Sequence, residues 1–208
     1  RIGHARLADD CAGSAGAVGR ERRHQLGLRP YIGRRSAIGE TERGARHLVL
    51  SSRRPLPDRA SWPSMKEDDA QTETVRSVLA IESLGASVSV MPADVADYDA
   101  MKQVFDAIAA RERPVRGIFH AAGLSEPAFI RDLDRDSVDR ILRPKLQGGL
   151  VLDALSREIP LDYFMMFSSV TSVWGSVMLG PYGAANQALD SLAHHAAWRC
   201  PSEAKLVN

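Results

Sequence analysis

From Arg46 onward, short apolar runs alternate with segments of helical periodicity, and this alternation restricts the possible folds more than any other feature of the sequence. The apolar runs lie at 47–52, 87–94, 115–123, 162–169 and 204–208. The segments with helical periodicity lie between them, at 67–85, 97–112, 136–158 and 181–199. Strands that alternate with helices are joined by right-handed crossovers and form a parallel sheet with helices on both faces. The sequence therefore predicts an α/β fold with a doubly wound parallel sheet.

The apolar residues of the predicted helices indicate which faces pack on the sheet. In segment 67–85 the residues expected on the buried face are Val75, Val78, Leu79 and Ile81. In segment 97–112 they are Met101, Val104, Phe105 and Ile108. Pro144 lies inside segment 136–158 and has no backbone N–H, so we expect it to interrupt and bend that helix.

Charge and composition exclude some classes of protein. The net charge of +1 combines an excess of about +5 in residues 1–46, which contain ten Arg and no Lys, with about −4 in the remainder. No run of 18 apolar residues is present, so we expect no membrane span. Cys11 and Cys200 are too few for a disulfide framework or a zinc site, so no metal is expected and a reducing cytoplasm is the expected location.

Ligands of doubly wound sheets bind beyond the carboxyl ends of the strands, so residues there are candidates for a site. Ser52 and Arg53 follow the first run. In dinucleotide-binding folds an acid at this place binds a ribose hydroxyl, whereas Arg accommodates a 2′-phosphate, so the pair favours NADPH. A solvated basic turn is the alternative. Asp94 and Val95 follow the second run; Asp94 is placed either to accept a hydrogen bond from adenine or to cap the next helix.

Small residues end the third run, in the sequence HAAG. Ala121, Ala122 and Gly123 offer almost no side chain, so the backbone could approach a flat ligand closely. Tight packing of a helix against the strand is the competing explanation.

Polar residues follow the fourth run. Ser169 lies at its end, and Tyr182 and Asn186 lie one turn apart at the start of the last helix. A free phenol has a pKa of about 10, and a nearby ammonium eases its use as a proton donor near neutral pH. Lys145, in the helix that contains Pro144, is the candidate ammonium, although a lone lysine on a helix is more often solvated.

These pieces together resemble the ketoreductase domain of modular type I polyketide synthases, a branch of the short-chain dehydrogenase/reductase superfamily with a Rossmann-like fold. The resemblance runs from about Arg43 to Asn208. The matching segments are GARHLVLSSRR, ADVAD, GIFHAAG, LRPKLQG, FSSVTSVWGSVMLGPYGAANQALD and LVN. In that branch Asn stands one turn after Tyr and the lysine comes from the preceding long helix, an arrangement that Tyr182, Asn186 and Lys145 fit.

The resemblance implies NADPH-dependent reduction of a β-ketoacyl thioester, carried by an acyl carrier protein, to a β-hydroxyacyl thioester. It implies that Ser169 and Tyr182 donate hydrogen bonds to the carbonyl oxygen and that Tyr182 is the acid. Lys145 would bind the nicotinamide ribose and promote proton donation by Tyr182, while Asn186 would hold a relay water or orient Lys145. Neighbouring polyketide synthase domains are the further implied partners, with no nucleic acid and no membrane.

Trp174 lies eight residues before Tyr182. A tryptophan here, with no Leu-Asp-Asp in the loop LSEPAFIRD, resembles reductases that form the L-configured alcohol. A packing role for Trp174 on a lid is the alternative.

The sequence predicts that the family's first strand, its glycine-rich turn and the helix that follows are disrupted. Residues Glu40–Glu42 alone separate Gly39, the apparent end of the turn, from the resumed match, whereas a crossover between parallel strands needs roughly a dozen residues. We therefore predict that residues 1–42 are an irregular Arg-rich segment not native to the fold, arising from a deletion or a frame disruption. Residues 43–208 would form a ketoreductase-like domain that lacks its last strand and lid.

Three functions remain open from the sequence. The first is an NADPH-dependent β-ketoacyl reductase or an inactive fragment of one. The second is a catalytically silent structural domain of a megasynthase. The third, an Arg-rich nucleic-acid binder, rests on residues 1–46 alone, which lack interleaved aromatic residues and any recognisable motif.

Overall fold

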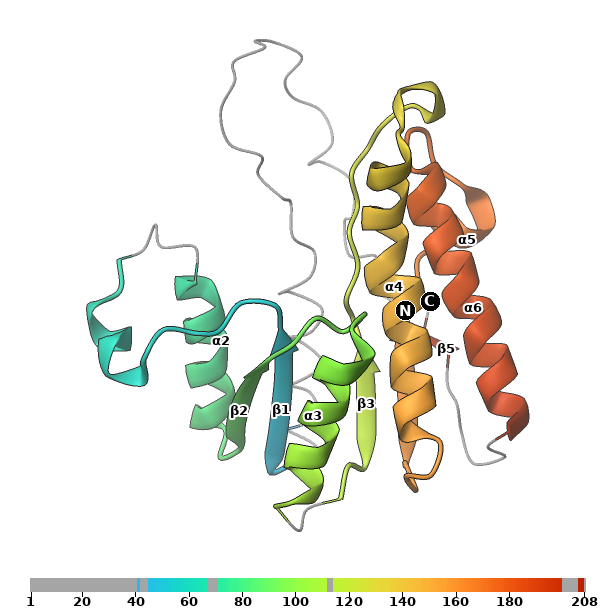
Figure 1. The fold of residues 1–208 in the computed structure, drawn as a ribbon. Helices are drawn as coiled ribbons and strands as arrows, with labels where there is room; N and C mark the ends of the chain where they lie inside the picture. Colours follow the sequence, from blue (N-terminus) through green and yellow to red (C-terminus); the bar gives the residue numbers. More distant parts are fainter. Residues whose placement is uncertain (1–40, 42–44, 67–70, 112–113, 200–205, 208) are drawn as a thin grey trace, which may run out of the picture.

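The computed structural model describes most of the chain after residue 44 (Figure 1). The described residues are 41, 45–66, 71–111, 114–199 and 206–207, with side chains described as far as residue 195 in the last helix. The Arg-rich segment 1–42 lies outside this part of the chain apart from Thr41, so its predicted irregularity stays a prediction.

In the described part of the chain, five parallel strands form two sheets. Their bounds are β1 (His47–Ser52), β2 (Ser87–Pro92), β3 (Gly117–His120), β4 (Tyr163–Phe167) and β5 (Leu206–Val207). One sheet has the order β1-β2 and the other β3-β4-β5. The general doubly wound fold has the strand order 3-2-1-4-5-6. In that order β2 and β1 of this chain correspond to strands 3 and 2, and β3, β4 and β5 correspond to strands 4, 5 and 6. Within the described ranges no strand joins β1 to β3.

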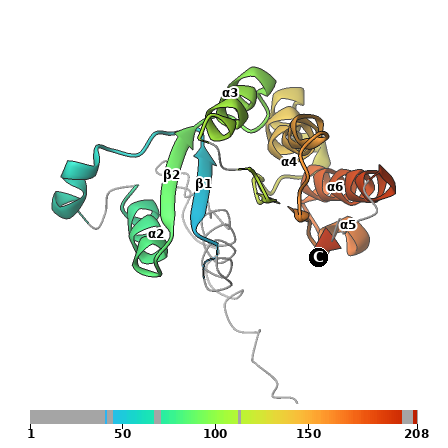
Figure 2. The same cartoon turned by 90° about the horizontal axis from the view of Figure 1, so that it is seen from below.

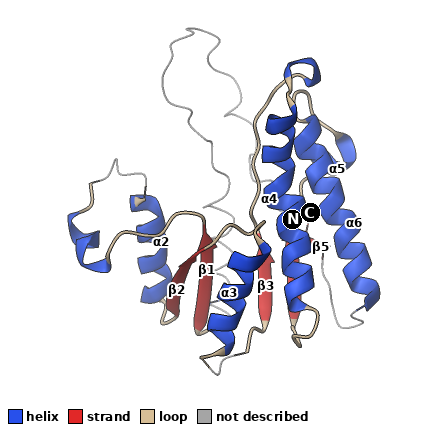
Figure 3. Ribbon diagram, viewed as in Figure 1, coloured by secondary structure: helices blue, strands red, loops and turns tan. Residues whose placement is uncertain are grey.

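Helices connect these strands (Figure 3). Their bounds are α2 (Thr72–Ser83), α3 (Tyr98–Ala109), α4 (Arg135–Ser156), α5 (Thr171–Trp174) and α6 (Gly180–Arg199), with 3₁₀ turns η1 (Arg59–Ser64) and η2 (Ile130–Asp132). Acidic caps start two of them: Asp97 accepts a hydrogen bond from Ala100 N at 3.0 Å, and Asp134 from Ser137 N at 2.7 Å. None of the helices in the described ranges is long and apolar enough to cross a bilayer.

Two details of the predicted helices are wrong. Leu79 is 46% exposed, although it was expected on the buried face with Val75 and Val78. Successive residues of an α-helix are about 100° apart, so Leu79 points away from the row that Val75, Val78 and Ile81 form toward the sheet. The interruption expected at Pro144 is also absent, because α4 continues through it and packs along α6.

Helices α2 and α3 cover opposite faces of the sheet formed by β1 and β2 (Figure 2). Leu48 packs toward Ile81 of α2, whereas its neighbour Val49 packs toward the cluster that contains Met101 of α3. Successive side chains of a strand point to opposite faces, so this alternation places the two helices on the two sides.

Helix α3 also holds the two sheets together. Its Met101 and Val104 belong to one buried cluster with Ile118 of β3 and with Val151 and Leu152 of α4. Partly buried side chains of β1 and β2 pack against the same cluster. The core of α3 therefore extends from the β1-β2 sheet to β3 and α4 and fixes the relative position of the two halves.

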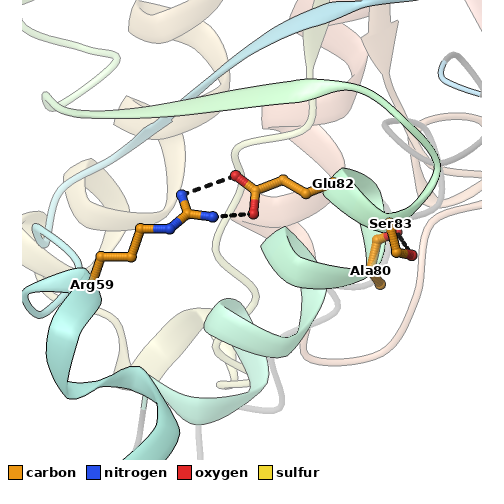
Figure 4. Close-up of polar contacts among 4 residues, drawn as sticks. All are labelled: Arg59, Ala80, Glu82 and Ser83. Carbon is orange, nitrogen blue, oxygen red and sulfur yellow. Dashed lines mark hydrogen bonds and ion pairs between the residues drawn. The ribbon is translucent and has the colours of Figure 1, made fainter.

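The Pro-rich connection after β1 is attached to α2 by an ion pair (Figure 4). Arg59 donates two hydrogen bonds to the two carboxylate oxygens of Glu82, one of them 3.0 Å long. The Ser83 hydroxyl donates to Ala80 O at 2.7 Å and closes the last turn of α2. Since Arg59 is well exposed, the pair orders the connection more than it stabilises the fold.

Candidate active site

Helices α4 and α6 both begin at the upper end of the molecule in Figure 1 and run side by side down its right half. Strand β4 packs against α6 through Met166, Leu189 and Leu192. The residues after β4 therefore lie beside the first turns of α6 and the middle of α4, where four predicted site residues occur.

Lys145 is directed from α4 toward the end of β4. The residue is 4% exposed, and its Nζ donates a 2.6 Å hydrogen bond to Phe167 O. The same Nζ lies 5.7 Å from the centre of the Tyr182 ring. The solvated-lysine alternative is therefore wrong: α4 carries a buried ammonium to the aromatic ring at the start of α6.

Gly123 leaves the space through which the Lys145 side chain passes. A Cβ at Gly123 would lie 2.7 Å from Lys145 Cε and 3.4 Å from its Nζ. The glycine after Ala121 and Ala122 therefore serves close packing against α4, the competing explanation for the HAAG sequence.

Ser169 is held by Thr171 in the first turn of α5. Its Oγ accepts hydrogen bonds from Thr171 N at 3.3 Å and from Thr171 Oγ1 at 3.1 Å. Because both contacts use the oxygen as acceptor, the Ser169 proton is left to be donated elsewhere. Thr171 also brings α5 against α6, since a Cβ at Gly183 would lie 3.1 Å from Thr171 O.

Asn186 is fully buried, with 0% exposure. Its Nδ2 donates to Tyr182 O at 2.6 Å, and its backbone oxygen accepts from Ser168 Oγ at 3.4 Å. Within the described part of the chain, Asn186 Oδ1 accepts no hydrogen bond. A buried amide oxygen left open in this way suits a water or a ligand donor.

His120, at the end of β3, is a residue whose importance the sequence reasoning missed. It is 1% exposed, and its Nε2 lies 3.0 Å from Lys145 O. Burial is the main reason that the pKa of His120 is lowered to about 4. The available signal was an imidazole at the end of an otherwise apolar strand.

The predicted cofactor residues Ser52, Arg53, Asp94 and Val95 form a second group at the ends of β1 and β2. The Ser52 hydroxyl donates to Arg54 O at 2.6 Å, and Arg53 is exposed.

Asp94 and Val95 both face α4. Asp94 Oδ1 accepts from Ala96 N at 3.0 Å, and Asp94 Oδ2 lies 3.7 Å from an Nη of Arg143. Asp94 does not cap α3, because Asp97 does so. A Cβ at Gly148 would lie 2.8 Å from a Val95 methyl, so Val95 packs on α4.

The two groups suit the two ends of a dinucleotide. A polar and basic group lies at β1 and β2, and a buried ammonium, a phenol and an open amide oxygen lie at β3, β4 and α6. In the described part of the chain no three His, Cys, Asp or Glu side chains gather as a metal ion would need.

Trp174 is 83% exposed at the end of α5. This exposure does not decide between the role in configuration and a packing role on a lid, so both stay predictions. Val173 and Val177 are exposed beside it in sequence, at 70% and 80%.

Comparison with known proteins places this arrangement in one family. A family model described as the KR domain matches residues 30–201. The 6-methylsalicylic acid synthase of Penicillium patulum is 39% identical over 157 residues, which are 75% of this chain and 9% of that protein. An N-terminal ketoreductase from the macrolactin assembly line superposes with a TM-score of 0.73 and 27% identity, over 85% of this chain and 34% of the other. A-type ketoreductases from a modular polyketide synthase give a TM-score of 0.70 and 32% identity, over 84% of this chain and 34% of theirs.

Proposed function

The chain belongs to the KR domain family, the ketoreductase domains of polyketide synthases, and on this premise we propose that it reduces a β-ketoacyl thioester on an acyl carrier protein to the β-hydroxyacyl thioester with NADPH. The chain spans 9–10% of the length of the first curated relatives it matches, so neighbouring synthase domains are proposed as its further partners. The cytoplasmic location expected from the sequence remains a prediction.

Tyr182 and Ser169 act on the substrate carbonyl in this proposal. Both hydroxyls donate to the oxygen, on which negative charge develops during reduction, and Tyr182 then transfers its proton to that oxygen. The contacts with Thr171 support the role of Ser169, because they orient its oxygen and leave its proton for donation.

Lys145 and Asn186 support Tyr182. The Lys145 ammonium lies 5.7 Å from the centre of the Tyr182 ring, and we propose that it holds the nicotinamide ribose beside this phenol and balances the negative charge that develops there during proton transfer. The open Oδ1 of Asn186 is proposed to accept from a water that returns a proton to this group, or to orient Lys145.

NADPH, when bound, would supply the hydride for the carbonyl carbon. Ser52, Arg53, Asp94 and Val95 would hold its adenosine end. Its nicotinamide end would lie at Lys145 and Tyr182 and over the small residues Ala121, Ala122 and Gly123. Trp174 is proposed to border the substrate and to influence the configuration of the alcohol.

The single observation that carries the proposal is the buried Lys145 ammonium 5.7 Å from the Tyr182 ring. A first experiment titrates the full chain with NADPH and with NADH while nicotinamide fluorescence is followed. We expect saturable binding that is tighter for NADPH. Absence of saturable binding would favour the catalytically silent domain and leave the family assignment intact.

A second experiment uses two tyrosine variants and a β-ketoacyl thioester surrogate. Tyr182→Phe removes the proposed acid and should abolish NADPH oxidation, whereas Tyr98→Phe, at the exposed start of α3, should not change it. Turnover by Tyr182→Phe close to that of the unchanged chain would refute the role of Tyr182.

A further inference from the structure

The imidazole of His120 makes a buried contact with the backbone of α4. Its Nε2 lies 3.0 Å from Lys145 O. A carbonyl oxygen can only accept a hydrogen bond, so Nε2 must carry the proton and donate it. The last residue of β3 is therefore attached to the helix at the residue that carries the buried ammonium.

A pair of glycines in α4 makes room for this ring. A Cβ at Gly148 would lie 3.1 Å from His120 Cε1, and a Cβ at Gly149 would lie 3.7 Å from His120 Cδ2. Glycine weakens the interior of a helix, so two in succession need a reason. Here the imidazole, together with Val95 and the leucines of α6, occupies the space that other residues would fill.

The side chain of Lys145 is confined by the same segment of chain. Gly123, three residues after His120, lies so close that an added Cβ would be 2.7 Å from Lys145 Cε. His120 thus fixes the backbone of Lys145, and Gly123 borders the path of its side chain to Phe167 O.

We propose that His120 is a positioning residue for Lys145. Its neutral ring donates from Nε2 to Lys145 O and fixes the position of α4 along its own axis relative to β3. At this position the ammonium reaches Phe167 O and the Tyr182 ring. The importance of this position rests on the proposed function of Lys145, but the contact itself can be tested without cofactor or substrate. The neutral form persists near pH 7, because burial lowers the pKa of His120 to about 4.

The test compares three variants of the full chain. His120→Leu removes the donor, whereas His120→Gln keeps an N–H donor at a similar reach. Ile118→Val, two residues earlier on β3, is a control that loosens the core of α3 and α4 without losing the contact with Lys145. Circular dichroism and thermal melting establish that each variant is folded.

The readout is the rate of Lys145 acetylation, measured by mass spectrometry and normalised to that of the exposed Lys102. In His120→Leu we expect the rate to rise about fivefold or more, as the loss of one buried hydrogen bond implies. His120→Gln and Ile118→Val should stay close to the unchanged chain. An unchanged rate in His120→Leu, or an equal rise in His120→Gln and Ile118→Val, would overturn the proposal.

A spectroscopic measurement on the unchanged chain covers the case in which the leucine variant does not fold. Two-bond ¹H–¹⁵N spectra distinguish the tautomers of histidine, and His120→Gln identifies the signal. The proposal requires a neutral ring protonated at Nε2 at about pH 7. A ring protonated at Nδ1 alone could not donate to Lys145 O and would contradict it. Neither readout uses NADPH, so a failure of the proposed reduction is distinguishable from a failure of this inference.

Discussion

Replacement of Gly123 by Ala should move Lys145 while leaving the fold intact. The added methyl carbon would lie 2.7 Å from Lys145 Cε, about 0.7 Å closer than ordinary contact. Gly123 does not have a positive φ, so the backbone accepts alanine. The atom that must yield is near the end of a flexible side chain, so we expect a change in unfolding free energy of no more than about 1 kcal/mol.

The consequence for the ammonium is larger. A shift of about 0.7 Å would lengthen the 2.6 Å hydrogen bond from Lys145 Nζ to Phe167 O beyond its favourable range. A misplacement of about 1 Å in a catalytic group can reduce rate by about 10²-fold. We therefore expect kcat/KM for the β-ketoacyl surrogate to fall about 10²-fold, with a rise in Lys145 acetylation as the readout independent of turnover.

Gly180→Ala is the matched control, because a Cβ there would meet its nearest neighbours at 3.6 and 3.7 Å, which is ordinary contact. It should leave kcat/KM and Lys145 acetylation unchanged. If Gly123→Ala kept both the turnover and the acetylation rate of the unchanged chain, the reasoning that Gly123 borders the path of Lys145 would be refuted.

Three further predictions concern other contacts. Thr171→Val removes one hydrogen bond to Ser169 Oγ and should lower kcat/KM about fivefold with little change in melting temperature, measured by steady-state kinetics and calorimetry. Asp97→Ala removes the cap of α3 and should lower the free energy of unfolding by about 1 kcal/mol in urea titrations, whereas no change would argue against the cap. His120 has a folded pKa of about 4, below its ordinary value near 6.5, so on acidification the unfolded chain binds a proton before the folded chain does. Its contribution to stability should therefore fall by about 3 kcal/mol between pH 7 and pH 4, and His120→Gln should lack this part of the pH dependence in denaturant titrations.

The strands and most helices could be predicted because their signals are local. β1 has the predicted bounds, His47–Ser52, and each end of the long helices lies within five residues of the end of the predicted segment. The row of side chains that a helix buries depends on what covers it, which is why Leu79 was placed wrongly. Helix α5, of four residues, has no period for a sequence pattern to detect.

The candidate site was predictable in its residue types and not in its contacts. Strand ends and the Tyr-Asn spacing led to Ser169, Tyr182 and Asn186, and the helix that contains Pro144 led to Lys145. The partners of Lys145 could not be found in the same way, because Gly123 and His120 lie more than 20 positions away in sequence and meet Lys145 through α4 packing on β3. Such contacts depend on the register of a helix against a strand, which short-range periodicity does not determine.

The site residues divide along the boundary between the two sheets. Lys145, Tyr182 and Asn186 come from helices that pack beside the β3-β4-β5 sheet, and Ser169 comes from the loop after β4. Ser52 ends β1 of the other sheet, and Asp94 follows its β2. Helix α3 and its core connect these halves. The position of the ammonium relative to the phenol therefore depends on contacts inside one half, while the position of the group of Ser52 and Asp94 relative to that half depends on α3. A core variant such as Val104→Ala, on α3, should then raise the Kd for NADPH by a larger factor than it raises the rate of Lys145 acetylation. Equal factors for the two quantities would show that the position of Lys145 depends on α3 as much as cofactor binding does.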